Sequence, residues 1–201
     1  MTAIVLLLAS LALAWLARPR TEWSGEQAAL FCSGLIGLCA SAWQLLTLSA
    51  PFIASAEASY LLTSLSQYAA FPLLLLVTVI QGLKRSGYVN ADTFNWDRII
   101  WGRILLVLCV IYVLMQRSHN LLLLDDIILL LACSAAITWL ITCMKGHAKP
   151  FYLVLSLLWL ALTVSYFVRI LPSEWLLPLG FVWSSTMIYR KHIETQITNT
   201  V

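Results

Sequence analysis

Long apolar segments that alternate with short polar connections dominate this chain. An α-helix needs about 20 apolar residues to cross the roughly 30 Å hydrocarbon layer of a bilayer, and about 17 still suffice. Seven segments approach or exceed this length, and we expect each to form a membrane-spanning helix: residues 2–17, 27–49, 59–83, 99–116, 121–144, 151–171 and 175–189. The sequence therefore predicts an all-α, polytopic transmembrane helical bundle, formed as a single integral-membrane domain over residues 1–201.

The composition agrees with this prediction, because 61% of the residues are apolar and only 10% carry a charge. Soluble domains are about half apolar and about a quarter charged. A water-soluble enzyme domain and a disordered segment are therefore excluded. The net charge of +3 is small and no basic run reaches five residues, so nucleic acid is not expected as a partner. The expected partner is the lipid bilayer.

The basic residues predict how the bundle is oriented. If the N-terminus lies outside, ten of the twelve basic residues fall at the cytoplasmic ends of the predicted spans. Nine lie in the connections or tails: Arg18, Arg20, Lys84, Arg85, Arg98, Lys145, Lys149, Arg190 and Lys191. The tenth, Arg103, is about one turn inside its span and can extend to the same side. We expect an exterior N-terminus and a cytoplasmic C-terminus, in a bacterial inner membrane given the short loops.

The first apolar segment admits a second interpretation. Ala12-Leu13-Ala14 has the A-x-A form of a signal-peptidase site. However, no Lys or Arg precedes the segment, whereas Arg18 and Arg20 follow it directly. We therefore favour a retained first helix, although removal of this segment would leave the orientation of the other six unchanged.

Ionisable residues at membrane depth are costly, so each is a candidate functional residue. Asp125 and Asp126 lie about one turn into the outer end of their span and point about 100° apart on the helix. Topology places four further candidates near the same face: Glu57, Arg117, His119 and Arg169. This cluster predicts a site for a coupling proton, a cation or a polar head group. The alternative is a structural salt bridge between Arg169 and Asp126 that joins two helices.

Neither a cofactor nor a metal ion is expected. The five cysteines lie inside apolar runs without a C-x-x-C pair, which is typical of buried reduced thiols. His119 is predicted outside, whereas His147 and His192 are predicted inside. Histidines on opposite faces cannot supply the two converging ligands of a haem or the cluster of a zinc site.

Small residues recur every four positions in two of the predicted spans. Ser33, Gly37 and Ser41 form one such stripe, and Gly180 with Ser184 forms another. Small residues at this spacing let helix backbones approach closely in a membrane. Packing inside the bundle is the simpler interpretation, and a surface for self-association or for a partner is the alternative.

Three functions remain compatible with the sequence. The scarcity of catalytic groups and the absence of a sizeable soluble domain favour a non-catalytic subunit or assembly partner of a larger membrane complex, held by other subunits or by copies of itself. The second hypothesis is a small carrier or channel for a proton, an ion or a lipophilic solute that uses Asp125 or Asp126. The third is a lipid-acting membrane enzyme, which would need His119 to pair with one of these aspartates.

Overall fold

The computed structural model describes residues 1–19, 23–50, 55–87, 96–145, 150–168 and 173–199. Over these residues the chain is helical and contains no strand. The elements in chain order are α1 (Thr2–Leu16), α2 (Gly25–Ser49), α3 (Ala56–Leu65), the π-helix η1 (Ser66–Ala70), α4 (Phe71–Arg85), α5 (Arg98–Arg117), α6 (Leu121–Met144), α7 (Pro150–Phe167), the 3-10 helix η2 (Ser173–Trp175) and α8 (Leu176–Asn199). The predicted all-α architecture is confirmed.

Among the described residues, five helices are long and apolar enough to cross a membrane: α2, the continuous helix α3–η1–α4, α5, α6 and α7. The apolar helix α1 has 15 residues, which correspond to about 23 Å and fall short of a full hydrocarbon layer. The seventh predicted segment lies within α8, which continues ten residues past its predicted end at Tyr189 to Asn199. The structure thus supports five of the seven predicted spans by length and composition.

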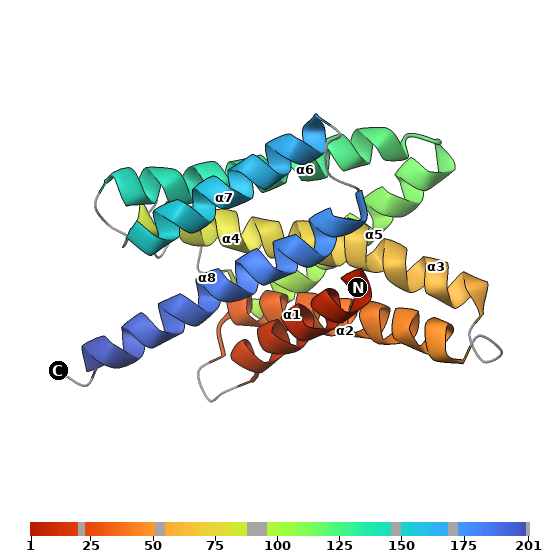
Figure 1. Cartoon of the computed structure of the whole chain (residues 1–201), viewed down its shortest axis with the longest axis horizontal. Coiled ribbons are helices and arrows are strands. Elements are labelled where there is room, and N and C mark those ends of the chain that lie inside the picture. The colour runs from red at the N-terminus through yellow and green to blue at the C-terminus, as the bar shows by residue number, and fades with distance from the viewer. Residues whose placement is uncertain (20–22, 51–54, 88–95, 146–149, 169–172, 200–201) are drawn as a thin grey trace.

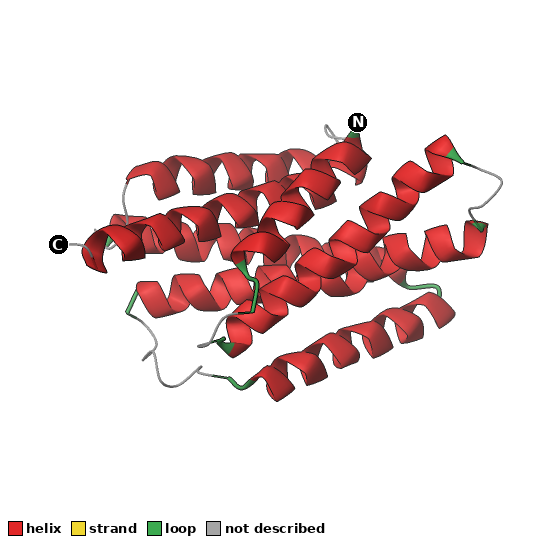
Figure 2. Ribbon diagram, turned by 90° about the horizontal axis from the view of Figure 1, so that it is seen from below, coloured by secondary structure: helices red, strands yellow, loops and turns green. Residues whose placement is uncertain are grey.

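The helices run roughly along one common direction (Figure 2). In Figure 1, α6 and α7 form one side of the bundle, α1 and α2 form the opposite side, and α4 and α8 lie between them. The continuous helix α3–η1–α4 is the most buried of the five long helices, whereas α5 is the least buried. Leu73, Leu74, Leu75 and Val77 of α4 are each at most 1% exposed, as expected for a helix that is apolar on all sides.

Indole and hydroxyl groups join the central helix to its neighbours. The Trp139 Nε1 group donates a hydrogen bond to the Thr78 carbonyl at 3.1 Å, and the Thr142 hydroxyl donates to the Gly82 carbonyl at 3.1 Å. In turn, Trp159 Nε1 of α7 donates to the Ala132 carbonyl of α6 at 3.2 Å. Interhelical hydrogen bonds of this kind stabilise a bundle where no water competes for the partners.

The small-residue stripes lie inside the bundle. Ser33 and Ser41 are fully buried, and a Cβ atom on Gly37 would lie 2.9 Å from Phe181 of α8 and 3.2 Å from Ser10 of α1. The stripe on α8 is also internal, because Ser184 is fully buried and Gly180 lies against Phe71 and Trp159. In the structure these small residues therefore pack against other helices of the same chain. The outer surface instead carries exposed apolar side chains, among them Leu122, Leu130 and Phe167.

Polar contacts identify the two ends of the bundle. At one end, Lys84 at the end of α4 pairs with Glu26 at the start of α2, and Lys145 after α6 donates to the Ser86 carbonyl after α4. We call this the Lys84 end. At the opposite end, called the Asp125 end, α2 and α5 end and α3 and α6 begin (Figure 1).

Candidate functional site

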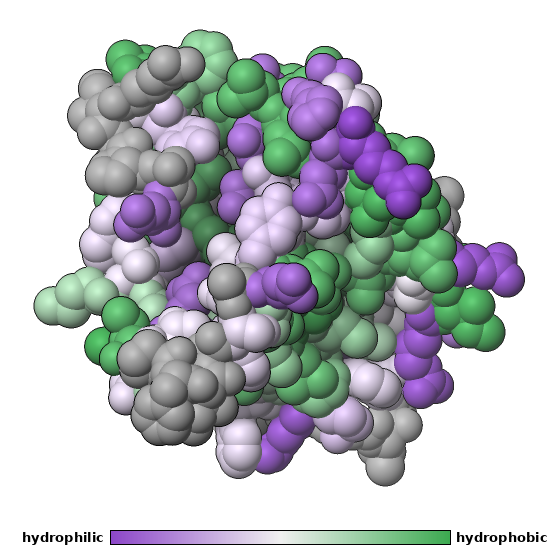
Figure 3. Space-filling view, turned by 90° about the vertical axis from the view of Figure 1, so that its right-hand side faces the viewer, coloured by the Kyte–Doolittle hydropathy of each residue, from purple (hydrophilic) through white to green (hydrophobic). Residues whose placement is uncertain are grey.

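A cavity of about 460 Å³ lies at the Asp125 end, and we call it the Asp125 cavity. Its polar lining comes from several helices that are distant in sequence: Gln44 and Thr47 of α2, Thr63 of α3, Gln67 of η1, Asp125 of α6, Tyr166 of α7 and Glu174 of η2. The first turns of α1 and α8 complete the wall. Figure 3 looks onto this end of the molecule, where hydrophilic and intermediate residues lie across the centre of the view.

Asp125 is half-buried, and its Oδ1 atom accepts a hydrogen bond from Gln67 Nε2 at 3.3 Å. A second polar contact joins the next pair of helices, because Gln44 Nε2 donates to the Thr63 hydroxyl at 3.3 Å. Thr63, Gln67 and Phe71 follow one another at intervals of four residues, and all three line the cavity. Amide and hydroxyl groups therefore surround the Asp125 carboxylate on one side of the cavity.

Gln67 lies in the π-helix η1, which ends two residues before Pro72. Pro72 lacks a backbone N–H group, and in an α-helix its ring would clash with the carbonyl of residue 68. The backbone widens directly before the proline, where the Phe71 N–H group bonds to the Ser66 carbonyl five residues earlier. Single π-helical turns of this kind occur frequently at functional sites. The adjacent residue Tyr68 stacks on Tyr112 of α5 at a centroid distance of 5.0 Å, which fixes η1 against that helix.

The structure separates the two adjacent aspartates. Asp125 lines the cavity, whereas Asp126 is exposed and is not part of the lining. Glu57, Arg117 and His119 are also exposed and do not line the cavity. The predicted outer cluster is thus reduced to Asp125 among the candidates that the structure describes. Arg169, the proposed partner of Asp126, lies outside the described residues.

His119 has a clear local role in the turn between α5 and α6. Its backbone is left-handed, with φ of 57°, and the Asn120 N–H group bonds to the Met115 carbonyl at 3.0 Å. The His119 N–H group bonds to the Gln116 carbonyl at 3.3 Å. These two bonds form a Schellman motif, in which a left-handed residue ends the helix.

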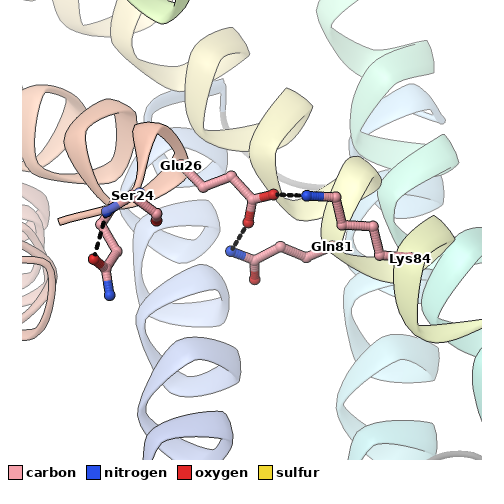
Figure 4. A network of polar contacts seen from close by, with 5 residues as sticks. Ser24, Glu26, Gln81 and Lys84 are labelled. Atoms are coloured by element: carbon pink, nitrogen blue, oxygen red, sulfur yellow. Dashed lines mark hydrogen bonds and ion pairs between the residues drawn. The ribbon is translucent and has the colours of Figure 1, made fainter. Parts of the chain in front are cut away.

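A second polar network lies at the Lys84 end (Figure 4). Glu26 accepts from Lys84 Nζ at 2.6 Å and from Gln81 Nε2 at 3.2 Å, so that α2 and α4 are joined. Ser24 and Gln27 form a capping box that starts α2, and Glu26 lies in the first turn, where a negative charge complements the helix dipole. The side chains of Glu26 and Lys84 are only 15% and 20% exposed.

Aromatic rings cover the cations at the same end. The Arg85 guanidinium lies 4.9 Å from the Tyr152 ring centroid, and Arg190 lies 4.4 Å from that of Phe151. Five described basic residues lie at helix boundaries of the Lys84 end, namely Arg18, Lys84, Arg85, Arg98 and Lys145, and Arg190 lies within α8 beside Phe151. Arg117, at the end of α5, lies at the Asp125 end. The Lys84 end therefore carries most of the described basic residues and is joined by polar contacts, whereas the Asp125 end contains the cavity.

Sequence reasoning identified Asp125, and topology also placed Glu174 near the same face, but the other polar residues of the lining were not assigned to this site. Gln44 and Gln67 carry no local signal beyond being polar in an apolar helix, and Tyr166 joins them only through the fold. A search of protein-family models, curated proteins and solved structures finds no match to this chain.

Proposed function

We propose that this protein is a small membrane carrier whose solute-binding site is the Asp125 cavity. The observation that supports it is the convergence of polar side chains from several helices on one half-buried carboxylate in a cavity of about 460 Å³. Ligand sites are concave, mainly apolar and lined by a few well-placed polar groups. Ionisable residues within membrane helices mark solute and ion pathways.

A carrier agrees better with the packing than an open channel. At the inner wall of the cavity, Phe71 is 1% exposed and stacks on the fully buried Phe181, so two aromatic rings close this side of the cavity. At the opposite end, Glu26, Gln81 and Lys84 join α2 to α4. A solute bound at Asp125 would therefore cross only after a conformational change that opens the Lys84 end.

The proposal includes the full predicted topology. In it, α1 and the apolar part of α8 cross the membrane beside the five longer helices, which gives seven spans. The Lys84 end faces the cytoplasm of a bacterial inner membrane, because basic residues are retained on that side. The N-terminus is then exterior and the C-terminus cytoplasmic. A cysteine introduced at Glu57 should react with a membrane-impermeant maleimide that is added outside right-side-out vesicles. A cysteine introduced at Arg98 should react only from the inner side of these vesicles.

Transport by reconstituted protein tests the function directly. We expect rapid addition of sodium, ammonium, choline, 2-phenylethylammonium or glycerol to proteoliposomes to reveal saturable uptake of at least one of these solutes. Asp125→Asn should abolish this uptake. The matched control is Asp126→Asn, which removes the same charge one residue away from an exposed position outside the cavity lining. Absence of uptake across the panel, or equal uptake by both variants, would refute the carrier function.

A non-catalytic subunit of a larger membrane complex is the second candidate. The observation in its favour concerns α5, because only 11% of the residues in the apolar part of this helix are buried within the chain. Leu106, Val110 and Leu114 of α5 are exposed. Lipid or a partner helix can cover such a face. Purification in mild detergent tests this candidate, because a monomer that brings no stoichiometric partner with it would reject the subunit function.

A further inference from the structure

The described lining of the Asp125 cavity contains two carboxylates and no Lys, Arg or His side chain. Glu174 lies just before α8, where its charge complements the positive end of that helix. Asp125 instead lies in the second turn of α6, and it accepts a hydrogen bond from the neutral amide of Gln67. Even a free amino group at Met1, which is 92% exposed, would leave the described part of the lining with net negative charge. A half-buried carboxylate in this setting favours a positively charged ligand.

The volume of the cavity separates an organic cation from a bare ion. A water molecule occupies about 30 Å³ of liquid volume, so 460 Å³ corresponds to on the order of ten waters. A proton or an alkali ion would leave nearly all of this space unoccupied. The volume instead falls within the roughly 300–1,000 Å³ of sites for small organic molecules.

The cavity also changes character with depth. Helices α3–η1–α4 and α6 both run from the Asp125 end toward the Lys84 end, so Phe71 and Ile128 lie about one turn deeper than Gln67 and Asp125. Phe71 is 1% exposed and Ile128 is 4% exposed, and both line the cavity. One helical turn is about 5.4 Å. The polar level and the apolar level are therefore separated by roughly the length of a short hydrocarbon chain or one aromatic ring.

We infer that the Asp125 cavity binds an organic monovalent cation with an apolar body. Its ammonium group pairs with the Asp125 carboxylate beside Gln67, and its apolar body lies against Phe71 and Ile128. This inference rests on the proposed function for its biological meaning, because it names the class of solute that the carrier would move. The binding itself can be measured without transport.

Three small probes test the two halves of the recognition separately. The first is 2-phenylethylammonium, which carries both a charge and an apolar ring. The second, 2-phenylethanol, keeps the ring without the charge, and the third, methylammonium, keeps the charge without the ring. Binding to the purified full chain in detergent is measured by calorimetry. We expect 2-phenylethylammonium to bind at least about tenfold more tightly than either other probe, since a hydrogen bond to a charged group and a buried ring each contribute.

Two variants locate the binding. Asp125→Asn should weaken 2-phenylethylammonium binding at least about tenfold and leave 2-phenylethanol binding unchanged. Asp126→Asn should leave both affinities unchanged. Equal affinity of the three probes, or an equal effect of the two variants, would overturn the inference, as would tighter binding of methylammonium than of 2-phenylethylammonium.

The outcomes also distinguish this inference from the carrier function. If the protein transports only sodium or protons and does not bind 2-phenylethylammonium, the carrier stands and the organic cation is wrong. If Asp125-dependent binding of 2-phenylethylammonium is measured but proteoliposomes show no uptake of it, the binding site stands and the carrier function is wrong.

Discussion

Gly180→Ala is the substitution whose effect follows most directly from the packing. A Cβ atom at this position would lie 2.3 Å from Phe71 Cε2 and 3.0 Å from Trp159 Cη2. Ordinary van der Waals contact begins near 3.4 Å, so the Phe71 ring must move by about 1 Å. That ring is 1% exposed and stacks on Phe181 at a centroid distance of 6.4 Å, which leaves it little room.

Two terms of opposite sign determine the size of the effect. Alanine is favoured over glycine inside a helix by about 1 kcal/mol. Extra atoms in a well-packed core cost about 1–3 kcal/mol, and the overlap of both Phe71 and Trp159 with the new methyl group places Gly180 at the upper end of this range. The net expectation is a loss of about 2 kcal/mol, or a melting temperature about 4–8 °C lower for a chain of this size.

Gly102→Ala provides the matched control. Gly102 also lies inside a helix, but no atom lies within 4 Å of the position that its Cβ would take. The propensity term acts alone there, so we expect the melting temperature to rise by up to about 4 °C. Both variants are compared with the parent chain in one detergent by thermal unfolding, followed by tryptophan fluorescence.

A second substitution tests whether Phe71 is the residue that conflicts with the new methyl group. Phe71→Leu alone removes part of a buried ring and should itself destabilise the protein. Added to Gly180→Ala, it should cost less than it does alone, because the smaller side chain leaves space for the methyl group. The reasoning is refuted if Gly180→Ala melts at or above the parent temperature, or if the two substitutions are simply additive.

Two further predictions concern the ends of the bundle. The side chains of the Glu26–Lys84 pair are 15–20% exposed. A double-mutant cycle of Glu26→Gln and Lys84→Met should therefore give a coupling free energy of about 1–2 kcal/mol, which is above that of surface pairs. A coupling free energy below about 0.5 kcal/mol would contradict the role of this pair in joining α2 to α4. His119→Gly should raise the melting temperature by about 2–4 °C, because glycine adopts φ of 57° without steric cost. Ser118→Gly, at φ of −83°, should give no such gain, and a loss on His119→Gly would show that the imidazole makes a needed contact.

Helix positions could be predicted from the sequence where length and apolarity alone determine them. The segments expected at 99–116 and 121–144 correspond to α5 (Arg98–Arg117) and α6 (Leu121–Met144). A polar turn bounds each of them, and burial of backbone polar groups in lipid requires a helix between such turns. The end of α8 was not predicted, because eight of its last ten residues are polar and the apolar pattern stops at Tyr189.

The sequence alone could not show which of Asp125 and Asp126 lines the cavity, and the reason is physical. A helix that is apolar on nearly all sides gives no periodic signal to show which face is buried. The rotation of α6 is set by long-range contacts, among them Trp139 with Thr78 and Gln67 with Asp125. Pro72 lies inside the third predicted span. Whether the backbone at such a proline kinks or widens into a π-turn depends on its packing partners, which here include Tyr112.

The short first and last predicted spans explain where the Asp125 cavity comes from. Figure 1 shows α1 and α8 beginning inside the bundle, short of the end that α2 and α3 reach. The first turns of both short helices line the cavity, beside Thr63 and Gln67 of the longer central helix. A polar site can then lie just below the ends of the short helices rather than at the centre of the bundle. Helix α1 packs along both α2 and α8. In the proposed carrier, a joint movement of α1, α2 and α8 relative to α4 is therefore the simplest change that would open the Lys84 end to a bound solute.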